Sequence, residues 1–286
     1  MKKIVLLLSL LFLVTCVFSQ QASGRLNQFS TFPPARKSDS SGFHFVVMAD
    51  RTGGHRDSIF SKAIRKVDLL RPSFVVAVGD LIEGYSDDPA VVASQWTSFA
   101  ATTMSLDMPF FFVPGNHDYS NAIQAKVWKA RFGVSYSHFL YKNVLFLFLN
   151  TEELLGGAGK GAISKAQYEY ARHALAENPK AGWTFVIMHQ PLWTQDSTGY
   201  WPQLEHLLAE RGHTVFAGHE HHYNMLQRNN GTYITMSTTG GFSRLRGLPE
   251  GEFDHVMWVT MTIGGPVFAN LMIDGIYPVA PLQQTP

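Results

Sequence analysis

The sequence predicts an α/β protein in which two β-sheets pack face to face, with helices on the outside. Three observations lead to this prediction. From residue 43 onward, apolar runs of strand length alternate with helical patterns, which is typical of parallel βαβ units. Beyond residue 230, strand patterns follow one another directly, as in antiparallel sheets. Hydrophobic residues make up 45% of the 286 residues, which is enough for one large core.

The strands are predicted from apolar runs that end at turn residues or polar clusters. Those expected to be parallel are FHFVVMA, SFVVAV, PFFFVP, WTFVIM and TVFA, which begin at residues 43, 73, 109, 183 and 214. A hairpin over 135–150 is expected to turn at Lys142 and Asn143. Antiparallel strands are expected over 232–237, 255–263 and 267–273, with the last two joined at 264–266.

Helices are expected between these strands. Asp57 is placed to cap the first, which ends at Pro72 and whose apolar face is formed by Ile59, Ala63, Ile64, Val67 and Leu70. Ser164 and Gln167 form a capping-box pattern in front of a second helix, whose apolar face includes Tyr168, Ala171 and Leu175.

A third helix carries Leu204, Leu207 and Leu208 and is expected to close at Gly212. Two further helices are expected over 90–104 and 121–131. No internal repeat is visible, so residues 43–286 are expected to form one domain.

The charge of the chain is nearly balanced. The formal net charge is +1, and the basic residues do not form a block. Because phosphate backbones are bound by clustered lysine and arginine, nucleic acid is not expected as a standing partner, and it stays open as a substrate.

Residues 1–19 have the pattern of a secretory signal peptide. Lys2 and Lys3 precede an apolar stretch over 4–18 that is short for a membrane span. Cleavage is expected after Ser19, in front of a linker over 20–42 that is rich in Ser, Gln, Pro and Arg. The mature protein is therefore expected to be secreted or periplasmic and to have no transmembrane span.

The single cysteine, Cys16, lies inside this leader. The mature chain would then contain no thiol and no disulfide, so an oxidising compartment would leave its fold unchanged. An alternative is that residues 13–16 form a lipobox and that Cys16 carries a lipid anchor, which would make the protein an envelope lipoprotein. Thr15 is a poor match to that motif.

Five polar clusters follow apolar runs and hold most of the groups suited to metal binding. They are Asp50, Gly79-Asp80, Gly115-Asn116-His117-Asp118, His189 and Gly218-His219-Glu220-His221. Singly, Asp50 and Asp80 are typical of turns or helix caps, Asn116-His117 of a plain turn, and His189 of a histidine whose bonds are satisfied within the structure. Together they are expected to project from one sheet edge, with His219 and His221 on the same face of a strand. Oxygen and imidazole donors without thiolates indicate a site for one or two divalent metals.

This series resembles the motifs of the calcineurin-like metallophosphoesterases, which are D-x-H, G-D, G-N-H-D/E, a single His and G-H-x-H. The match runs from Asp50 to His221. The resemblance implies a four-layer α/β/β/α sandwich of two mixed sheets. It also implies hydrolysis of phosphomonoesters or phosphodiesters by a hydroxide held between two divalent or mixed-valence metal ions, with manganese, iron and zinc favoured.

The resemblance assigns a role to each matching residue. Asp80 would bridge both metals. One metal site would be completed by Asn116, His189 and His219, and the other would contain Asp50 and His221. His117 would not bind metal; it would lie near the leaving group and stabilise phosphoryl oxygens or protonate the departing oxygen.

The first motif departs from the family, because Thr52 stands where the family has histidine. One nitrogen ligand is therefore missing or replaced, with His55, Glu83 and Tyr85 as candidates. Purple acid phosphatases resemble this family, also lack that histidine and use a tyrosine three residues after the G-D aspartate, whereas Tyr85 lies five residues after Asp80. The departure supports an alternative function, a catalytically weak phosphoryl-ligand-binding envelope protein on the same fold.

The partner is expected to be a phosphorylated substrate whose identity no motif encodes. Loops over 154–161 and 193–201 are expected to border the site and to set the choice of substrate. Arg51, Arg244 and Arg246 are candidates to hold phosphate oxygens, and Arg51 is the best placed because it follows Asp50.

Overall fold

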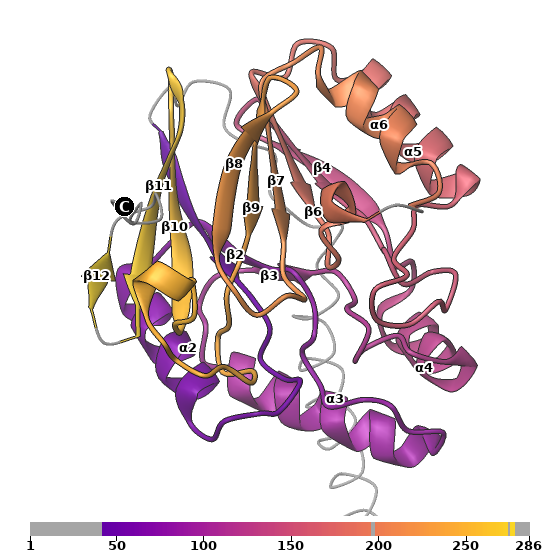
Figure 1. Ribbon diagram of the computed structural model, residues 1–286, viewed down its shortest axis with the longest axis vertical. Coiled ribbons are helices and arrows are strands. Elements are labelled where there is room, and N and C mark those ends of the chain that lie inside the picture. The colour runs from indigo at the N-terminus through magenta and orange to yellow at the C-terminus, as the bar shows by residue number, and fades with distance from the viewer. Residues whose placement is uncertain (1–41, 196–197, 274, 278–286) are drawn as a thin grey trace, which may run out of the picture.

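The computed structural model of the protein describes residues 42–195, 198–273 and 275–277. It is a four-layer α/β/β/α sandwich, in which two six-stranded sheets pack face to face and helices cover the outer faces (Figure 1). The fold class expected from the sequence is confirmed. The signal peptide predicted over 1–19 lies outside the described residues, as does the linker predicted over 20–42 except for Gly42.

The first sheet has the order β12-β11-β10-β1-β2-β3. Its strands are β1 (Phe43–Met48), β2 (Phe74–Ala77), β3 (Phe110–Phe112), β10 (His255–Thr262), β11 (Gly265–Met272) and β12 (Ile276–Tyr277). Strands β1, β2 and β3 are parallel, whereas β10 runs antiparallel to β1 and to β11. The antiparallel hairpin expected near the C-terminus therefore extends the parallel strands into one mixed sheet.

The second sheet has the order β4-β5-β6-β7-β9-β8. Its strands are β4 (Ser137–Tyr141), β5 (Val144–Phe148), β6 (Trp183–Ile187), β7 (His213–Ala217), β8 (Asn224–Arg228) and β9 (Gly231–Thr235). The four inner strands are parallel, and the two edge strands are antiparallel to their neighbours. The hairpin of β4 and β5 turns at Lys142 and Asn143, both with positive φ, as the sequence predicts.

Strand β9 corrects one prediction. It was expected to be antiparallel, and it is antiparallel to β8 but parallel to β7. Strand β8 was not predicted, because its sequence NMLQR has no apolar run and its side chains are mostly exposed at the sheet edge.

The described residues form five α-helices and two 3₁₀ turns. They are α2 (Ile59–Leu70), α3 (Pro89–Thr103), α4 (Ala122–Phe132), α5 (Lys165–Glu177), α6 (Trp201–Leu208), η1 (Leu192–Thr194) and η2 (Leu248–Glu250). In this part of the chain none of them has the length and apolar character needed to cross a membrane. Ser164 caps α5 as predicted, by accepting a hydrogen bond from the backbone N–H of Gln167.

Two predicted helix boundaries are wrong. The residue that caps α2 is Ser58, with φ 66° and no side-chain hydrogen bond, rather than Asp57. Leu70 is 45% exposed, and Phe60 takes its place on the buried face of α2. Helix α6 ends before Gly212, whose missing side chain instead leaves room for the indole of Trp183.

Three apolar layers hold the sandwich together. Between the sheets lie closely packed aromatic side chains, among them Phe45, Phe74, Phe146 and Phe185. Helices α2, α3 and α4 cover the outer face of the first sheet, and α5 and α6 cover that of the second (Figure 1). Because the sheets are locked by this central layer, the loops at the ends of their strands are held in fixed relation.

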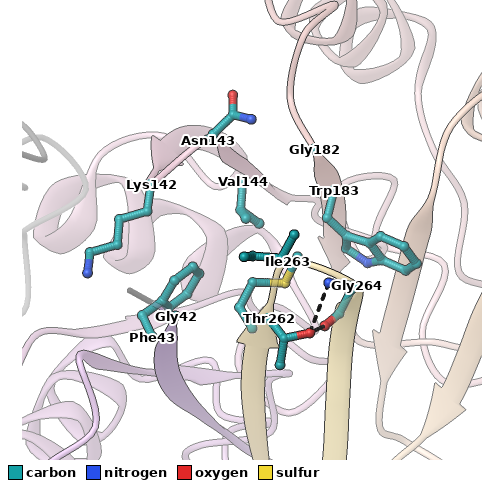
Figure 2. A pocket seen from close by; sticks show the side chains of 12 residues that line it. Gly42, Phe43, Lys142, Asn143, Val144, Gly182, Trp183, Thr262, Ile263 and Gly264 are labelled. Carbon is teal, nitrogen blue, oxygen red and sulfur yellow. Dashed lines mark hydrogen bonds between the residues drawn. The ribbon is translucent and has the colours of Figure 1, made fainter. Parts of the chain in front are cut away.

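A pocket of about 440 Å³ lies where strands β1, β5 and β6 begin. Figure 2 shows Phe43, Val144 and Trp183 around the turn that carries Ile263, whose side chain is 100% exposed. The polar clusters predicted from the sequence follow the other ends of the strands, so this pocket lies at the opposite end of the sandwich.

Candidate metal centre

The predicted polar clusters come together where strands of both sheets end. Those after strands of the first sheet are Asp50 after β1, Asp80 after β2 and Asn116 after β3. Those after strands of the second sheet are His189 after β6 and His219 and His221 after β7. The expectation of a single sheet edge is wrong, since each sheet supplies three donors and the site lies between them.

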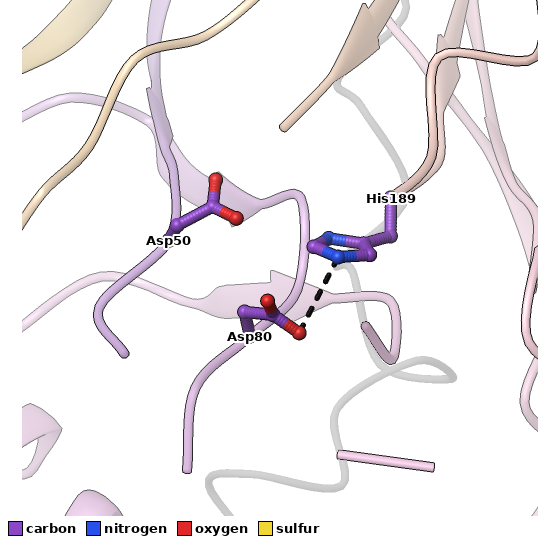
Figure 3. Close-up of side chains that lie close together, drawn as sticks. All are labelled: Asp50, Asp80 and His189. Atoms are coloured by element: carbon purple, nitrogen blue, oxygen red, sulfur yellow. Dashed lines mark ion pairs between the residues drawn. The ribbon is translucent and has the colours of Figure 1, made fainter. Parts of the chain in front are cut away.

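Asp50, Asp80 and His189 form the buried centre of this group. One ligand atom from each lies within 4.8 Å of the others, and all three residues are buried. His189 Nε2 lies 3.3 Å from Asp80 Oδ1. Figure 3 shows the two carboxylates and the imidazole directed toward one another. The arrangement can hold a cation.

Asn116 joins His189 to His219. Its Oδ1 lies 2.9 Å from His189 Nε2 and 2.8 Å from His219 Nδ1. His189 Nδ1 donates to the carbonyl of Val78 at 2.9 Å, which orients the ring and directs Nε2 into the site. The amide Nδ2 of Asn116 donates to the phenol oxygen of Tyr85 at 2.8 Å, so that Oδ1 faces the histidines.

His221 approaches from the side of Asp50. Its Nε2 lies 3.5 Å from Asp50 Oδ1, and its Nδ1 donates to the carbonyl of Phe242 at 2.8 Å. Strand β7 ends at Ala217, so His219 and His221 do not share a strand face as predicted. Both have positive φ, 72° and 54°, and these left-handed turns direct the two imidazoles into the site.

Glycines allow the loops that carry the donors to approach one another closely. A Cβ at Gly115 would overlap Asp80 Oδ1, and a Cβ at Gly218 would overlap Asp50 Oδ2. The glycines in the G-N-H-D and G-H-x-H clusters are therefore required by packing against the carboxylates.

His117 lies beside the donor group on its partly exposed side. Its backbone N–H donates to Asp80 Oδ1 at 2.9 Å, and its Nδ1 donates to the carbonyl of Glu83 at 2.7 Å. The other ring nitrogen, Nε2, faces the backbone of Gly53. A Cβ built on Gly53 would lie 3.4 Å from this nitrogen. The Nε2 atom is thus the one available for proton transfer.

Asp118 holds two donor loops together and was not among the predicted site residues. It is fully buried and accepts hydrogen bonds from the backbone N–H groups of Leu81, Ile82 and Gly115. It thereby ties the loop after β2 to the loop after β3. The feature of the sequence that could have indicated this role is the position of Asp118 at the end of the G-N-H-D cluster.

Burial and neighbouring charges shift the pKa values of the donors in opposite directions. Burial opposes ionisation of Asp80, but the charge and hydrogen bonding of His189 and His117 outweigh it and lower its pKa to about 2. Burial opposes protonation of His189, but the Asp80 carboxylate outweighs it and raises its pKa to about 10. Burial and the neighbouring His189 lower the pKa of His219 to about 4. These shifts hold Asp80 as a carboxylate and His189 as an imidazolium, and a metal cation bound between them replaces the proton of His189.

An orphan carboxylate oxygen supports the same conclusion. Asp50 Oδ2 is buried and has no hydrogen-bond partner. A buried carboxylate oxygen without a partner is costly, and a bound cation removes that cost. With the amide oxygen of Asn116 and three imidazoles close by, the donor set suits a borderline divalent metal such as manganese, iron or zinc. The residues present fit the metal that the resemblance implies.

The proposed substitutes for the first-motif histidine have different surroundings. Thr52 is buried, and its hydroxyl has no hydrogen-bond partner. His55 Nε2 faces Asp57 at 3.8 Å, and Glu83 accepts a hydrogen bond from the backbone of His55. Among the three candidates, Tyr85 is hydrogen-bonded to a predicted ligand, through the amide of Asn116.

Arg51 does not face the donor group. Its guanidinium donates to the carbonyl of Leu81 at 2.6 Å and lies over the rings of Phe60 and Phe99. Arg51 was a candidate to hold phosphate oxygens, but its charge is directed into the layer between the first sheet and its helices.

Known proteins are similar to this chain in sequence and fold. Residues 43–223 match the calcineurin-like phosphoesterase family. The serine/threonine-protein phosphatase CPPED1 of Mus musculus is 27% identical over 187 residues, which cover 59% of this chain and 60% of that protein. The 3',5'-cyclic adenosine monophosphate phosphodiesterase CpdA of Escherichia coli K12 is 26% identical over 168 residues, which cover 54% of this chain and 58% of that protein.

The chain thus spans less than two thirds of the length of these two relatives. The purple acid phosphatase PPD1 of yellow lupin (Lupinus luteus) has the same fold, with a TM-score of 0.63 and 16% identity, and the alignment covers 83% of this chain and 53% of that one. The family match extends over more than half of the chain and contains every cluster of the candidate centre, so the chain belongs to the calcineurin-like phosphoesterase family.

Proposed function

We propose that the protein is a hydrolase that cleaves phosphomonoesters or phosphodiesters at a centre of two metal ions. The observation that carries this proposal is the convergence of five oxygen and nitrogen donors near Asp80. The family resemblance assigns these five donors to two metal sites that share the carboxylate of Asp80. One site takes Asn116, His189 and His219, and the other takes Asp50 and His221.

Cations bound to these donors supply Lewis acidity toward water and toward phosphoryl oxygens. The chain provides orientation and proton transfer. The carbonyls of Val78 and Phe242 fix the imidazoles of His189 and His221 with Nε2 directed inward. His117 is held through Nδ1, so its imidazolium donates the Nε2 proton to the departing ester oxygen.

The test is a metal-resolved activity screen on the purified mature protein. An aryl phosphomonoester and an aryl phosphodiester are each offered with manganese, iron, zinc, cobalt or nickel. We expect turnover that a chelator abolishes and added metal restores. Absence of chelator-sensitive turnover on both esters with all five metals would overturn the proposal.

The bridging role of Asp80 has its own test. Asp80→Asn removes the charge while retaining the shape, so the protein should lose the ability to bind two metal equivalents. Metal analysis of the purified variant measures this directly, and an unchanged stoichiometry would contradict the bridging role.

A second function, a catalytically weak phosphoryl-ligand-binding protein, is favoured by the first motif. Thr52 replaces a nitrogen ligand, and its buried hydroxyl has no partner. This weakens the half-site that contains Asp50. One bound metal equivalent, phosphate binding and no turnover would support the binding protein, whereas two equivalents with turnover would support the enzyme.

We further propose that the protein acts outside the cytoplasm, on the basis of the leader over residues 1–19. N-terminal sequencing of protein recovered from cell fractions tests this. A mature N-terminus after Ser19 supports a secreted or periplasmic protein, and a lipid on Cys16 supports an envelope lipoprotein.

A further inference from the structure

Two large aromatic side chains lie at the exposed side of the candidate centre. Tyr85 is 53% exposed and Phe242 is 57% exposed, whereas Asp50 and His189 are buried. Exposed aromatic surface of this size is unfavourable in water unless something covers it. Tyr85 and Phe242 are each hydrogen-bonded to a predicted ligand, so both aromatic residues are part of the structure of the site.

Phe242 is attached to the site through its backbone. Its carbonyl accepts the hydrogen bond of His221 Nδ1, and its N–H donates to the carbonyl of Gly53 at 3.1 Å. A Cβ at Gly54 would lie 2.8 Å from the Cβ of Phe242, so this loop packs closely under the phenyl group. The side chain is thus held at the edge of the centre.

Tyr85 is attached from the other direction. Its ring meets the imidazole of His117 edge-on, with the centroids 4.8 Å apart and an angle of 82° between the planes. Its phenol oxygen accepts the hydrogen bond from Asn116 Nδ2. The ring therefore has a defined place beside the proposed proton donor.

These contacts define where the leaving group of a phosphoester must lie. The proton comes from His117 Nε2, which faces Gly53. A departing oxygen that receives this proton lies beside Gly53, and its substituent extends past the ring of Tyr85 on one side and the loop under Phe242 on the other.

Three arginines near this position make contacts within the protein. Arg51 donates to Leu81, and Arg56 is paired with Asp254 through two hydrogen bonds. Arg246 is paired with acidic side chains of its own segment, Glu250 and Glu252. Arg51, Arg56 and Arg246 thus make contacts within the protein, whereas Arg244, in the same loop as Arg246, is exposed.

We propose that Tyr85 and Phe242 form a leaving-group subsite that selects phosphoesters of alcohols carrying an uncharged aromatic ring. This inference rests on the proposed function. A ring placed between two aromatic side chains buries their exposed faces and gains edge or offset-stacking contacts. The selected class therefore includes aryl and heteroaryl esters.

The test compares two ligands that share one phosphonate group. Phenylphosphonate and methylphosphonate are titrated by calorimetry into the full-length mature protein loaded with manganese. We expect phenylphosphonate to bind about ten-fold more tightly than methylphosphonate. In Phe242→Ala, which keeps the backbone contacts to His221 and Gly53, the ratio of the two affinities should fall to about two.

Leu245→Ala is the matched control, since Leu245 lies in the same loop and is 50% exposed. It should retain the ten-fold ratio. Equal binding of both phosphonates to the unaltered protein, or an unchanged ratio in Phe242→Ala, would overturn the subsite while leaving the proposed function intact. Binding of neither phosphonate, together with no turnover of aryl esters, would overturn both.

Discussion

Asn116 is the amide in the donor group, and its value as a ligand depends on the direction in which its oxygen points. Half a turn of the side chain would present an NH₂ group, which repels a cation. Tyr85 prevents this by accepting a hydrogen bond from Nδ2. Tyr85 is itself held by Gln124, whose Oε1 accepts from the backbone N–H of Tyr85 at 3.1 Å.

Tyr85→Phe should therefore weaken cation binding while retaining the ring. Loss of one hydrogen bond of about 1 kcal/mol corresponds to roughly five-fold lower affinity. Calorimetric titration of manganese into metal-free protein measures the change. Tyr168→Phe on α5 is the control and should leave the affinity unaltered. An unchanged affinity in Tyr85→Phe would mean that the hydrogen bond to Tyr85 is not needed to orient the Asn116 amide.

His117→Ala should separate metal binding from catalysis. The imidazole is placed to transfer a proton, so its loss should lower kcat by about 10²–10⁴. The metal content should stay at the level of the unaltered protein, because His117 is not among the predicted ligands. Steady-state kinetics with metal analysis on the same preparation checks both. Loss of metal would assign His117 to the ligand set.

At the scale of elements, the strand ends are brought together by loops that leave no space between them. The loop after β7 packs directly on the carboxylate that follows β1, and the loop after β3 packs on the carboxylate that follows β2. An added side-chain atom in these loops should therefore displace the donor side chains more than it disturbs the packing of the core.

Gly218→Ala should displace the carboxylate of Asp50, because the new Cβ would overlap Oδ2. We expect loss of one metal equivalent with the other retained. The control is Gly264→Ala at the opposite end of the sandwich, where the closest atom to a Cβ is Thr262 Oγ1 at 3.8 Å. Metal analysis and thermal unfolding distinguish the two variants. Two retained equivalents in Gly218→Ala would contradict the placement of Asp50.

At the scale of the whole molecule, His255 links the two sheets. The backbone N–H of Ser237, which follows β9, donates to His255 Nε2 at 3.0 Å. His255 Nδ1 therefore carries the proton and donates to Asn270 Oδ1 on β11 at 2.8 Å. The ring is buried in its neutral form, and burial lowers its pKa to about 4 despite the opposing hydrogen bond to Asn270.

The protein should accordingly lose stability in acid. The unfolded state binds a proton at an ordinary histidine pKa of about 6.5, and the folded state does so near 4. The stabilisation is complete above pH ~6.5 and is lost as the pH falls toward ~4, by roughly 3 kcal/mol in total. Urea unfolding at several pH values, with chelator present, measures the slope. His255→Gln should flatten this slope, and an equal slope in both proteins would contradict the assignment.

The sequence predicted the features that are encoded locally. The apolar runs were sufficient to place ten of the twelve strands in the described residues, and the polar residues that follow them include the six candidate donors. Edge strand β8 was missed because exposed strands lack an apolar run. The cap of α2 was misplaced because Ser58 and Asp57 are both common capping residues.

The contacts that could not be predicted from the sequence join residues that lie far apart in the chain. Tyr85 meets Asn116 across 31 positions, and His219 meets Asn116 across 103. The sequence predicted that His219 and His221 point the same way because they lie two residues apart on a strand. In the structure they lie in a loop, and positive φ values that depend on the loop's surroundings direct them into the site. The buried role of Asp118 likewise depends on two loops meeting in space.

The equal division of donors between the sheets makes the protein suited to fragment complementation. A cut between α4, which ends at Phe132, and β4, which begins at Ser137, leaves three donors on each piece. Neither piece alone contains all six candidate donors, so metal-dependent turnover should arise only when both are mixed. The chain could thus serve as a split reporter whose signal requires reassembly of the two halves.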